Sequence, residues 1–247
     1  MVERFKAFGI HFALSASVIA VFLCLVFFVW YPTPYDQIYS SWDVIKIVAG
    51  VDVVMGPLLT LVVFNSQKKT TELKRDLSII VVLQLVALGW GVNVTYSARP
   101  AFLVFSNGTF YSFSKSDVDV SKLMHKKLEP AIFESPVMVY LKPPKDVQES
   151  REILMEVVDG VAPELIYRTS RYLPASEHMQ RIFRFSLDIN KISKNEKSLK
   201  FINNFVEEHG GKLSDYAFYR LRGGKVYITM VLNKNTGDIA GLINEAL

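Results

Sequence analysis

The stretch GVDVVMGPLLTLVVF, residues 50–64, decides how this 247-residue chain is interpreted. Small and apolar residues make up all of it except a single carboxylate, Asp52, and a Gly56-Pro57 pair stands in its middle. An apolar run of this length fits either a buried segment of a soluble protein or a helix that crosses a lipid bilayer. The sequence on either side has to distinguish the two.

Two further apolar runs flank this one. Residues 7–31 contain one ionisable side chain, His11, before the closing tyrosine, and residues 77–94 contain no charge. A helix rises about 1.5 Å per residue, so about 20 residues cross a hydrocarbon core of about 30 Å. No polar face interrupts the runs, which argues against buried helices of a soluble protein. We therefore predict a membrane domain over residues 1–97, with transmembrane helices at about 7–31, 44–65 and 77–97.

The first run also has features of a cleaved signal peptide, because residues 1–6, MVERFK, form a charged start. It is longer than the usual apolar region of such peptides, and it leads into VFFVWYPTPY, residues 26–35, which is no small-residue cleavage site. We therefore expect this helix to be retained.

Basic residues mark one side of the predicted membrane domain. Those that precede the first helix or connect the second to the third are Arg4, Lys6, Lys68, Lys69, Lys74 and Arg75. Residues 31–43 contain no Lys or Arg, although Lys46 follows them closely. The positive-inside rule places the N-terminus in the cytoplasm and everything after Tyr96 on the far side. Aromatic residues gather at this far boundary, as an interfacial belt would: Trp30, Tyr31, Tyr35, Trp42, Trp90 and Tyr96.

Asp52 is a costly residue for a membrane helix, and helical rise places it about 10 Å from the outer end. Gly56 lies one turn further on the same face, and Pro57 removes a backbone donor. Gln84, in the third helix, is a second polar group within an apolar run. Two interpretations remain open. Either these residues join helices of this chain and fix their register, or they form a site at which a transmembrane helix of another protein packs.

Residues 98–247 have the composition of a soluble domain, with 21 Lys and Arg residues and 18 Asp and Glu residues. Period-two patterns and turn residues predict an α+β domain with antiparallel strands that end in a meander. The predicted helices cover 116–128, 146–159 and 196–208. The predicted strands cover 101–113 with a turn at 106–108, 135–142, 216–222, 225–233 and 238–243. We expect the segment 170–181 to be a surface loop.

The chain contains no catalytic constellation that we can find. Motifs for an esterase nucleophile, a zinc protease, a phosphate loop or a dinucleotide are missing. A single cysteine, Cys24, and four scattered histidines offer no metal-ligand spacing. We therefore expect no enzymatic activity, no cofactor and no metal. A net charge of +4 without a basic aromatic stripe also gives no reason to expect nucleic acid as a partner.

Several stretches together resemble one family, the type IV pilin accessory proteins (the TfpX/TfpZ family). The resembling stretches are ERFKAFGIHF (3–12), VFFVWYPTPY (26–35), GVDVVMGPLLTLVVFN (50–65), ARPAFLVF (98–105) and LRGGKVYITMVLNKNTGDIAG (221–241). The resemblance covers the membrane half densely and the outer domain only at its two ends.

The resemblance implies a multi-pass protein in the inner membrane of Gram-negative bacteria, with a periplasmic C-terminal domain, that accompanies the major pilin and promotes pilus assembly. Its partners would be the lipid bilayer and the pilin, which waits in the membrane as one apolar helix with a globular head outside. Asp52, Gly56, Pro57 and Gln84 would then meet the pilin helix, and the outer domain would meet the head.

Two other classes of function compete with this one. A membrane sensor would bind a ligand in the periplasmic domain and would need a partner to signal, because the predicted cytoplasmic segments are short. An enzyme at the membrane surface would use Asp36 and Asp43, although two carboxylates in one loop are usually solvated charge.

Overall fold

A computed structural model describes residues 2–31, 42–65, 67–131, 136–189, 195–224 and 226–243 of the chain. The chain divides into two compact units, Met1–Arg99, here called the helix bundle, and Pro100–Leu247, here called the α+β domain.

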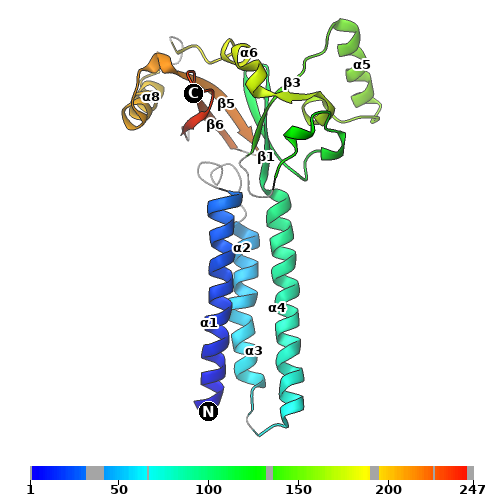
Figure 1. Ribbon diagram of the computed structural model, residues 1–247, viewed down its shortest axis with the longest axis vertical. Coiled ribbons are helices and arrows are strands. Elements are labelled where there is room, and N and C mark those ends of the chain that lie inside the picture. The colour runs from blue at the N-terminus through cyan, green and yellow to red at the C-terminus, as the bar shows by residue number, and fades with distance from the viewer. Residues whose placement is uncertain are drawn as a thin grey trace. The chain divides into compact units, whose positions relative to one another are not determined.

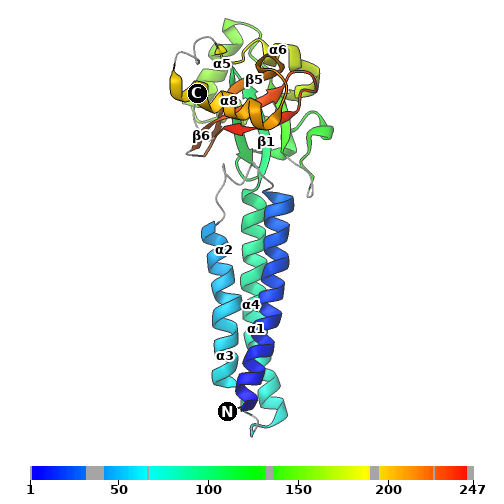
Figure 2. The same cartoon turned by 90° about the vertical axis from the view of Figure 1, so that its left-hand side faces the viewer.

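The helix bundle consists of three long helical stretches that lie side by side (Figures 1 and 2). The stretches Val2–Trp30, Ile45–Val63 and Thr70–Ala98 are each long and apolar enough to cross a membrane. A π-helical turn, η1, ends the first stretch, and another, η3, interrupts the second. The elements are α1 (Val2–Leu25), η1 (Val26–Trp30), α2 (Trp42–Ala49), η3 (Gly50–Met55), α3 (Gly56–Val63) and α4 (Thr70–Ala98).

Helices α1 and α4 extend beyond the apolar runs that predict them. Helix α4 begins at Thr70, before the predicted start at 77, and α1 begins at Val2. The added residues of α4 include Glu72, Lys74 and Arg75, which are good helix formers and continue the helix past the apolar stretch.

Aromatic side chains close one end of the bundle. Trp30 and Tyr31 are buried, the rings of Trp30 and Tyr96 lie 5.4 Å apart, and the Tyr31 hydroxyl donates to the backbone oxygen of Thr95 at 2.8 Å. Trp90, in contrast, is exposed. Of the expected aromatic belt, Tyr35 and the side chain of Trp42 lie outside the described residues.

The α+β domain is built on one seven-stranded sheet with the strand order β4-β3-β1-β2-β5-β6-β7. The strands are β1 (Pro100–Ser106), β2 (Thr109–Ser114), β3 (Val137–Leu141), β4 (Tyr172–Pro174), β5 (Tyr216–Gly223), β6 (Val226–Asn233) and β7 (Ile239–Ile243). The α-helices are α5 (Val147–Val158), α6 (Met179–Phe183) and α8 (Glu196–His209). The 3₁₀ turns are η4 (Val120–Lys122), η5 (Lys126–Leu128), η6 (Leu165–Tyr167), η7 (Thr169–Arg171), η8 (Ala175–His178) and η9 (Leu213–Asp215).

The α+β class agrees with the prediction, but the expectation of antiparallel strands is wrong for two pairs. Strand β1 pairs with β3 in parallel, and β2 pairs with β5 in parallel. A parallel pair needs a long crossover, and the segments that precede β3 and β5 are long enough to provide it. The hairpin β1–β2 and the meander β5–β6–β7 are antiparallel. Asn107 and Gly108 both have positive φ in the tight turn of the first hairpin, as that turn requires.

The predicted helix at 116–128 is wrong, because that segment forms two 3₁₀ turns, η4 and η5. Its polar residues bond to nearby backbone instead of continuing a helix. Asp117 accepts from the backbone N–H of Ser114 at 2.7 Å, and Asp119 accepts from that of Ser121 at 3.1 Å. Such local bonds compete with helix formation.

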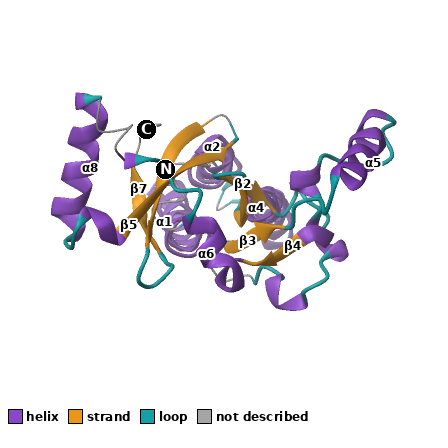
Figure 3. Cartoon of the chain, turned by 90° about the horizontal axis from the view of Figure 1, so that it is seen from above, coloured by secondary structure: helices purple, strands orange, loops and turns teal. Residues whose placement is uncertain are grey.

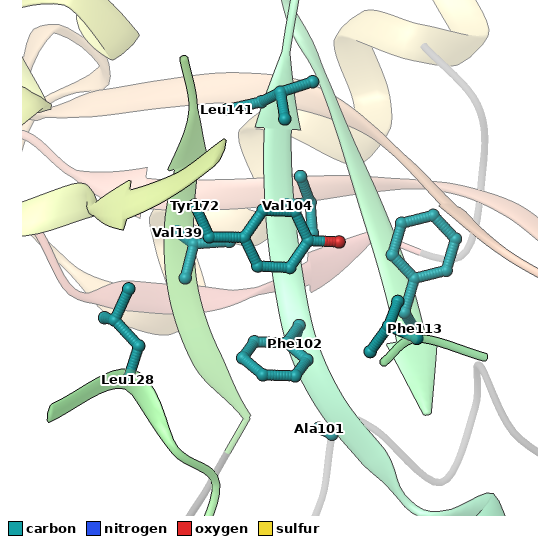
Figure 4. Packing of buried hydrophobic residues seen from close by; sticks show 9 residues of the cluster. Ala101, Phe102, Val104, Phe113, Leu128, Val139, Leu141 and Tyr172 are labelled. Carbon is teal, nitrogen blue, oxygen red and sulfur yellow. The ribbon is translucent and has the colours of Figure 1, made fainter. Parts of the chain in front are cut away.

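The expected surface loop at 170–181 is also wrong, because it contains the edge strand β4. Tyr172 of β4 is fully buried, and its ring lies 5.4 Å from that of Phe102. Figure 4 shows Tyr172 among the core residues of β1 and β3, including Val104 and Val139. Its hydroxyl donates to the backbone oxygen of Ile166 at 2.6 Å, which satisfies the one polar atom of the side chain.

Candidate functional site

The second helical stretch carries a widened turn at its acidic residue. In η3 the backbone N–H of Gly56 bonds to the carbonyl of Val51, five residues earlier. Pro57 has no N–H, so it cannot bond to the carbonyl of Val53, and the helix relaxes into a π-turn at that point. Asp52 lies in this turn and is only 4% exposed. Turns of this kind are frequent at functional sites.

Gln84 of α4 connects the widened turn to α1. Its Nε2 donates to the backbone oxygen of Asp52 at 3.0 Å and approaches the Ser15 hydroxyl at 3.4 Å. Its Oε1 lies 2.8 Å from Nε2 of His11. An amide oxygen only accepts, so this nitrogen of His11 carries the proton. Nδ1 of His11 lies 2.6 Å from the hydroxyl of Thr60 in α3, so one hydrogen-bonded chain joins all three helical stretches.

Gly56 makes the approach of Gln84 possible. A Cβ atom on Gly56 would overlap the side-chain amide of Gln84, so Gln84 would have to move away. Pro57, next in the chain, is buried as well. Of the four residues that the sequence singles out, Asp52, Gly56 and Gln84 therefore meet inside the bundle, and Pro57 is buried beside them.

Sequence reasoning missed three members of this cluster. His11 and Ser15 share a face of α1 at a spacing of four, and Thr60 lies eight residues after Asp52, about two helical turns further along. Polar residues one or two turns apart inside two apolar runs are the pattern by which they could have been found.

The carboxylate of Asp52 contacts Gln84 by a side-chain hydrogen bond, but one of its two oxygens has no partner among the described residues. Gln84 also bonds to the backbone oxygen of Asp52, and the carboxylate atom without a partner is the buried Oδ1. A buried acceptor without a partner costs free energy, so it marks a position for a donor.

A groove between α1 and α4 leads to this carboxylate. It has a volume of about 220 Å³. Five apolar side chains line it, Leu14, Val18, Val81, Leu85 and Leu88. The other four lining residues are polar: His11, Ser15, Asp52 and Gln84. The two helices carry exposed leucines along the groove, Leu14 on α1 and Leu85 on α4. The groove therefore has apolar walls and a polar floor.

The α+β domain has a cavity of its own, of about 320 Å³, beside η4 and η7. Its charged side chains already have partners. Lys122 pairs with Asp119 at 3.4 Å, and Arg168 pairs with Glu156. No group of His, Cys, Asp or Glu side chains in the described part of the chain is suited to hold a metal ion. We therefore take the groove of the helix bundle as the candidate functional site.

Comparison with known proteins gives the family. The model of the fimbrial assembly protein FimB matches residues 1–40. The fimbrial assembly protein of serogroups C1 and C2 of Dichelobacter nodosus is 41% identical over 118 residues, which is 48% of this chain and 90% of that protein. This chain belongs to the fimbrial assembly protein family. The resemblance that the sequence motifs predict is thereby confirmed.

Other fimbrial assembly proteins match over the same share of the chain. Those of serogroups I and E1 of Dichelobacter nodosus are 42% and 41% identical over 118 residues. The match spans about half of their length, 46% in each case. No solved structure matches this fimbrial assembly protein.

Proposed function

We propose that this fimbrial assembly protein is an accessory protein of type IV pilus assembly that spans the bacterial inner membrane three times. The lengths and apolar character of the three helical stretches support the spans. The basic residues Lys68, Lys69, Lys74 and Arg75 support a cytoplasmic N-terminus and a periplasmic C-terminal domain. We assign the protein a binding role without a catalytic step.

The partner in this proposal is the major pilin, and the groove between α1 and α4 holds its transmembrane helix. Lipid tails fill an apolar groove as well as a helix does, so apolar lining alone gives no reason for a protein partner. The polar floor gives that reason, because the unpartnered Oδ1 of Asp52 needs a donor that lipid tails lack. This carboxylate is the observation that carries the proposal.

The four residues that the sequence singles out, Asp52, Gly56, Pro57 and Gln84, then have two different roles. Gly56, Pro57 and Gln84 hold the helices of this chain together, because Gly56 and Gln84 pack on each other and Pro57 is buried. Asp52 is the residue left for the pilin helix. In this proposal both interpretations that the sequence leaves open apply. Gly56, Pro57 and Gln84 join helices of this chain, and Asp52 meets a helix of another protein.

Replacing Asp52 tests the role of the groove. Because Gln84 bonds to the backbone oxygen of residue 52, Asp52→Asn and Asp52→Ala keep that bond in place. We expect Asp52→Ala to lower the amount of pilin that co-purifies with the protein about threefold to eighteenfold, the range of one interhelical hydrogen bond in a membrane. Ser17→Ala is the matched control, since the Ser17 hydroxyl bonds only to its own helix, outside the groove. Unchanged pilin capture and surface piliation at normal expression would overturn the proposal.

The orientation has its own test. A reporter that is active only after export, fused after Leu247, should be active, and the same reporter fused within 67–69 should be inactive. The reverse pattern would place the α+β domain in the cytoplasm and remove any contact with the pilin head.

A further inference from the structure

The hairpin formed by β5 and β6 carries two exposed arginines on one face of the sheet. Arg220 and Arg222 are two residues apart in β5, so their side chains leave the same face. Tyr227 of β6 pairs with Arg222 across the two strands and is 56% exposed. The guanidinium carbon of Arg222 lies over the Tyr227 ring, 5.4 Å from its centre. A cation and an aromatic ring therefore stand together on the surface of the domain.

The described part of the chain offers no acidic partner to these arginines. Neither Arg220 nor Arg222 forms an ion pair there, and residues 216–233 contain no Asp or Glu. The residues that flank the arginines in the neighbouring strands are uncharged as well: Thr109 and Tyr111 of β2, and Thr229 and Tyr227 of β6. The hairpin therefore presents uncompensated positive charge, which suits an anionic partner.

The register of the sheet places this charge at the end of the sheet where the chain leaves the helix bundle. Strand β1 begins at Pro100, directly after Arg99, the C-cap residue of α4. Pro100 pairs with Ser114, the last residue of β2. Strand β5 runs parallel to β2 and ends at Gly223, opposite Ser112. Strand β5 therefore ends, and β6 begins, at the same end of the sheet as Pro100.

Helix geometry gives the level of that end in the membrane that we propose. The third apolar run ends at Val94, and α4 continues for four residues to Ala98. Four residues rise about 6 Å, and a headgroup layer is about 5–7 Å thick, half the difference between the hydrocarbon core and the whole bilayer. The start of β1 is thus level with the headgroups. Arg222 is the next-to-last residue of β5 and Tyr227 the second of β6, so both lie next to this end.

The types of the exposed side chains favour a lipid surface over a protein. Among the described residues of the hairpin, the exposed ones are Arg220, Arg222, Gly224 and Tyr227. They lack the apolar centre that a protein interface usually has. Tyrosine is enriched at membrane–water interfaces, and arginine is attracted to anionic headgroups. Both preferences are met by one surface, that of a bilayer with anionic lipid.

We propose that the hairpin of β5 and β6 binds anionic phospholipid headgroups of the membrane that the bundle spans, with Arg222 and Tyr227 in contact and Arg220 behind them. The inference rests on the proposed function for the membrane spans and does not depend on the pilin. It gives the α+β domain a second attachment to the membrane besides its connection to α4.

The test uses the full-length protein in nanodiscs of two compositions, phosphatidylcholine alone and phosphatidylcholine mixed with anionic phosphatidylglycerol. A photoreactive phenylalanine replaces Tyr227, and the mass of the product identifies captured lipid. Capture should be at least fivefold higher in the anionic discs, the contribution of about one basic side chain at such a surface. The same residue at Asn235, which is exposed in the turn at the other end of β6, should capture no lipid.

Substitutions of Arg222 separate charge from shape. Arg222→Gln should lower capture from position 227 in anionic discs about fivefold, whereas Arg222→Lys keeps the charge and should retain capture within about twofold. Arg151→Gln is the matched control, because Arg151 is exposed and lies on α5, on the other side of the domain from β5 (Figure 3). Exposed positions tolerate such changes, so thermal unfolding of the variants should coincide.

A photoreactive residue at Leu83, which is exposed on α4, separates this inference from the proposed function. Position 83 should capture lipid in both kinds of disc. Capture from 83 with none from 227, or equal capture from 227 in the two kinds of disc, would overturn the role of the hairpin alone. An equal loss in Arg222→Gln and Arg151→Gln, or capture of a protein in place of lipid from 227 in cells, would also overturn it. No lipid captured from 83 would overturn the membrane spans, and the role of the hairpin with them.

Discussion

The helix bundle and the α+β domain place their polar side chains in opposite ways. The bundle keeps His11, Thr60 and Gln84 inside and exposes leucines and valines, whereas the domain buries aromatic residues such as Phe102 and Tyr172. Water drives apolar side chains inward in the domain. In the lipid environment that we propose for the bundle that drive is missing, so hydrogen bonds and close packing have to select the arrangement of helices. Burial of apolar side chains thus determines the fold of the domain, whereas hydrogen bonds and close packing determine the arrangement of helices in the bundle.

The largest effect should come from the core of the domain. Phe102→Ala removes a fully buried ring and should lower the free energy of unfolding of the domain by about 3–5 kcal/mol. Leu83 on α4 is exposed, and Leu83→Ala should change the stability of the bundle by less than about 0.5 kcal/mol. Pulse proteolysis of the full-length protein in urea measures both. Equal losses would show that the two units do not differ in the way described.

The next effect concerns close packing in the bundle. Gly56→Ala places a Cβ atom where Gln84 lies, so it should cost about 1–3 kcal/mol of bundle stability by displacing that side chain. Gly89→Ala on α4 meets no atom within 4 Å and should cost nothing. Thermal unfolding in detergent distinguishes them. A neutral Gly56→Ala variant would contradict the close contact between these helices.

Removal of the hydrogen bonds themselves should have a smaller effect. Gln84→Leu keeps the bulk and deletes the bonds to His11 and to the backbone of Asp52. We expect a loss of about 0.6–1.7 kcal/mol, the range for interhelical bonds in membranes. Unfolding in mixed micelles, with Gln67→Leu in the exposed connection as control, provides the measurement. A gain in stability would show that packing alone holds the bundle.

The smallest effect is a pH dependence of the attachment of α5. The hydrogen bond from Arg171 and then that from the backbone of Lys145 hold the pKa of Glu149 below its usual value of 4.5. A lowered pKa in the folded state gives stability that is present above pH 4.5 and is lost as the pH falls below that value. Hydrogen exchange of α5 should therefore accelerate in this range, and Arg171→Gln should weaken the pH dependence, since the bond from the backbone of Lys145 remains. The same dependence in the Arg171→Gln variant would exclude this ion pair as its cause.

Local patterns predict the elements whose residues are close in sequence. Asp146 caps α5 by accepting from the N–H of Glu149, and Asn107-Gly108 forms its turn, both as their residue types indicate. The parallel pairing of β2 with β5 depends on segments far apart in the chain, and no local pattern contains it.

The same limit applies to the candidate site. The cost of a carboxylate in an apolar run singles out Asp52 from sequence alone. That Gln84 reaches the backbone oxygen of Asp52 depends on the π-turn before Pro57, which is a property of the folded helix. The attachment of α5 likewise depends on Arg168 and Arg171, which come from a segment that looks irregular in the sequence.

Photocrosslinking from two neighbouring residues of α4 tests the central claim most directly, that the groove between α1 and α4 holds the pilin helix. Leu85 lines the groove, and Val86, which is similarly exposed, lies about 100° further around the helix and outside it. A photoreactive residue at 85 should capture the pilin, and the same residue at 86 should capture it at least fivefold less. Equal capture from both positions, or capture of only lipid and of this chain from position 85, would contradict the account.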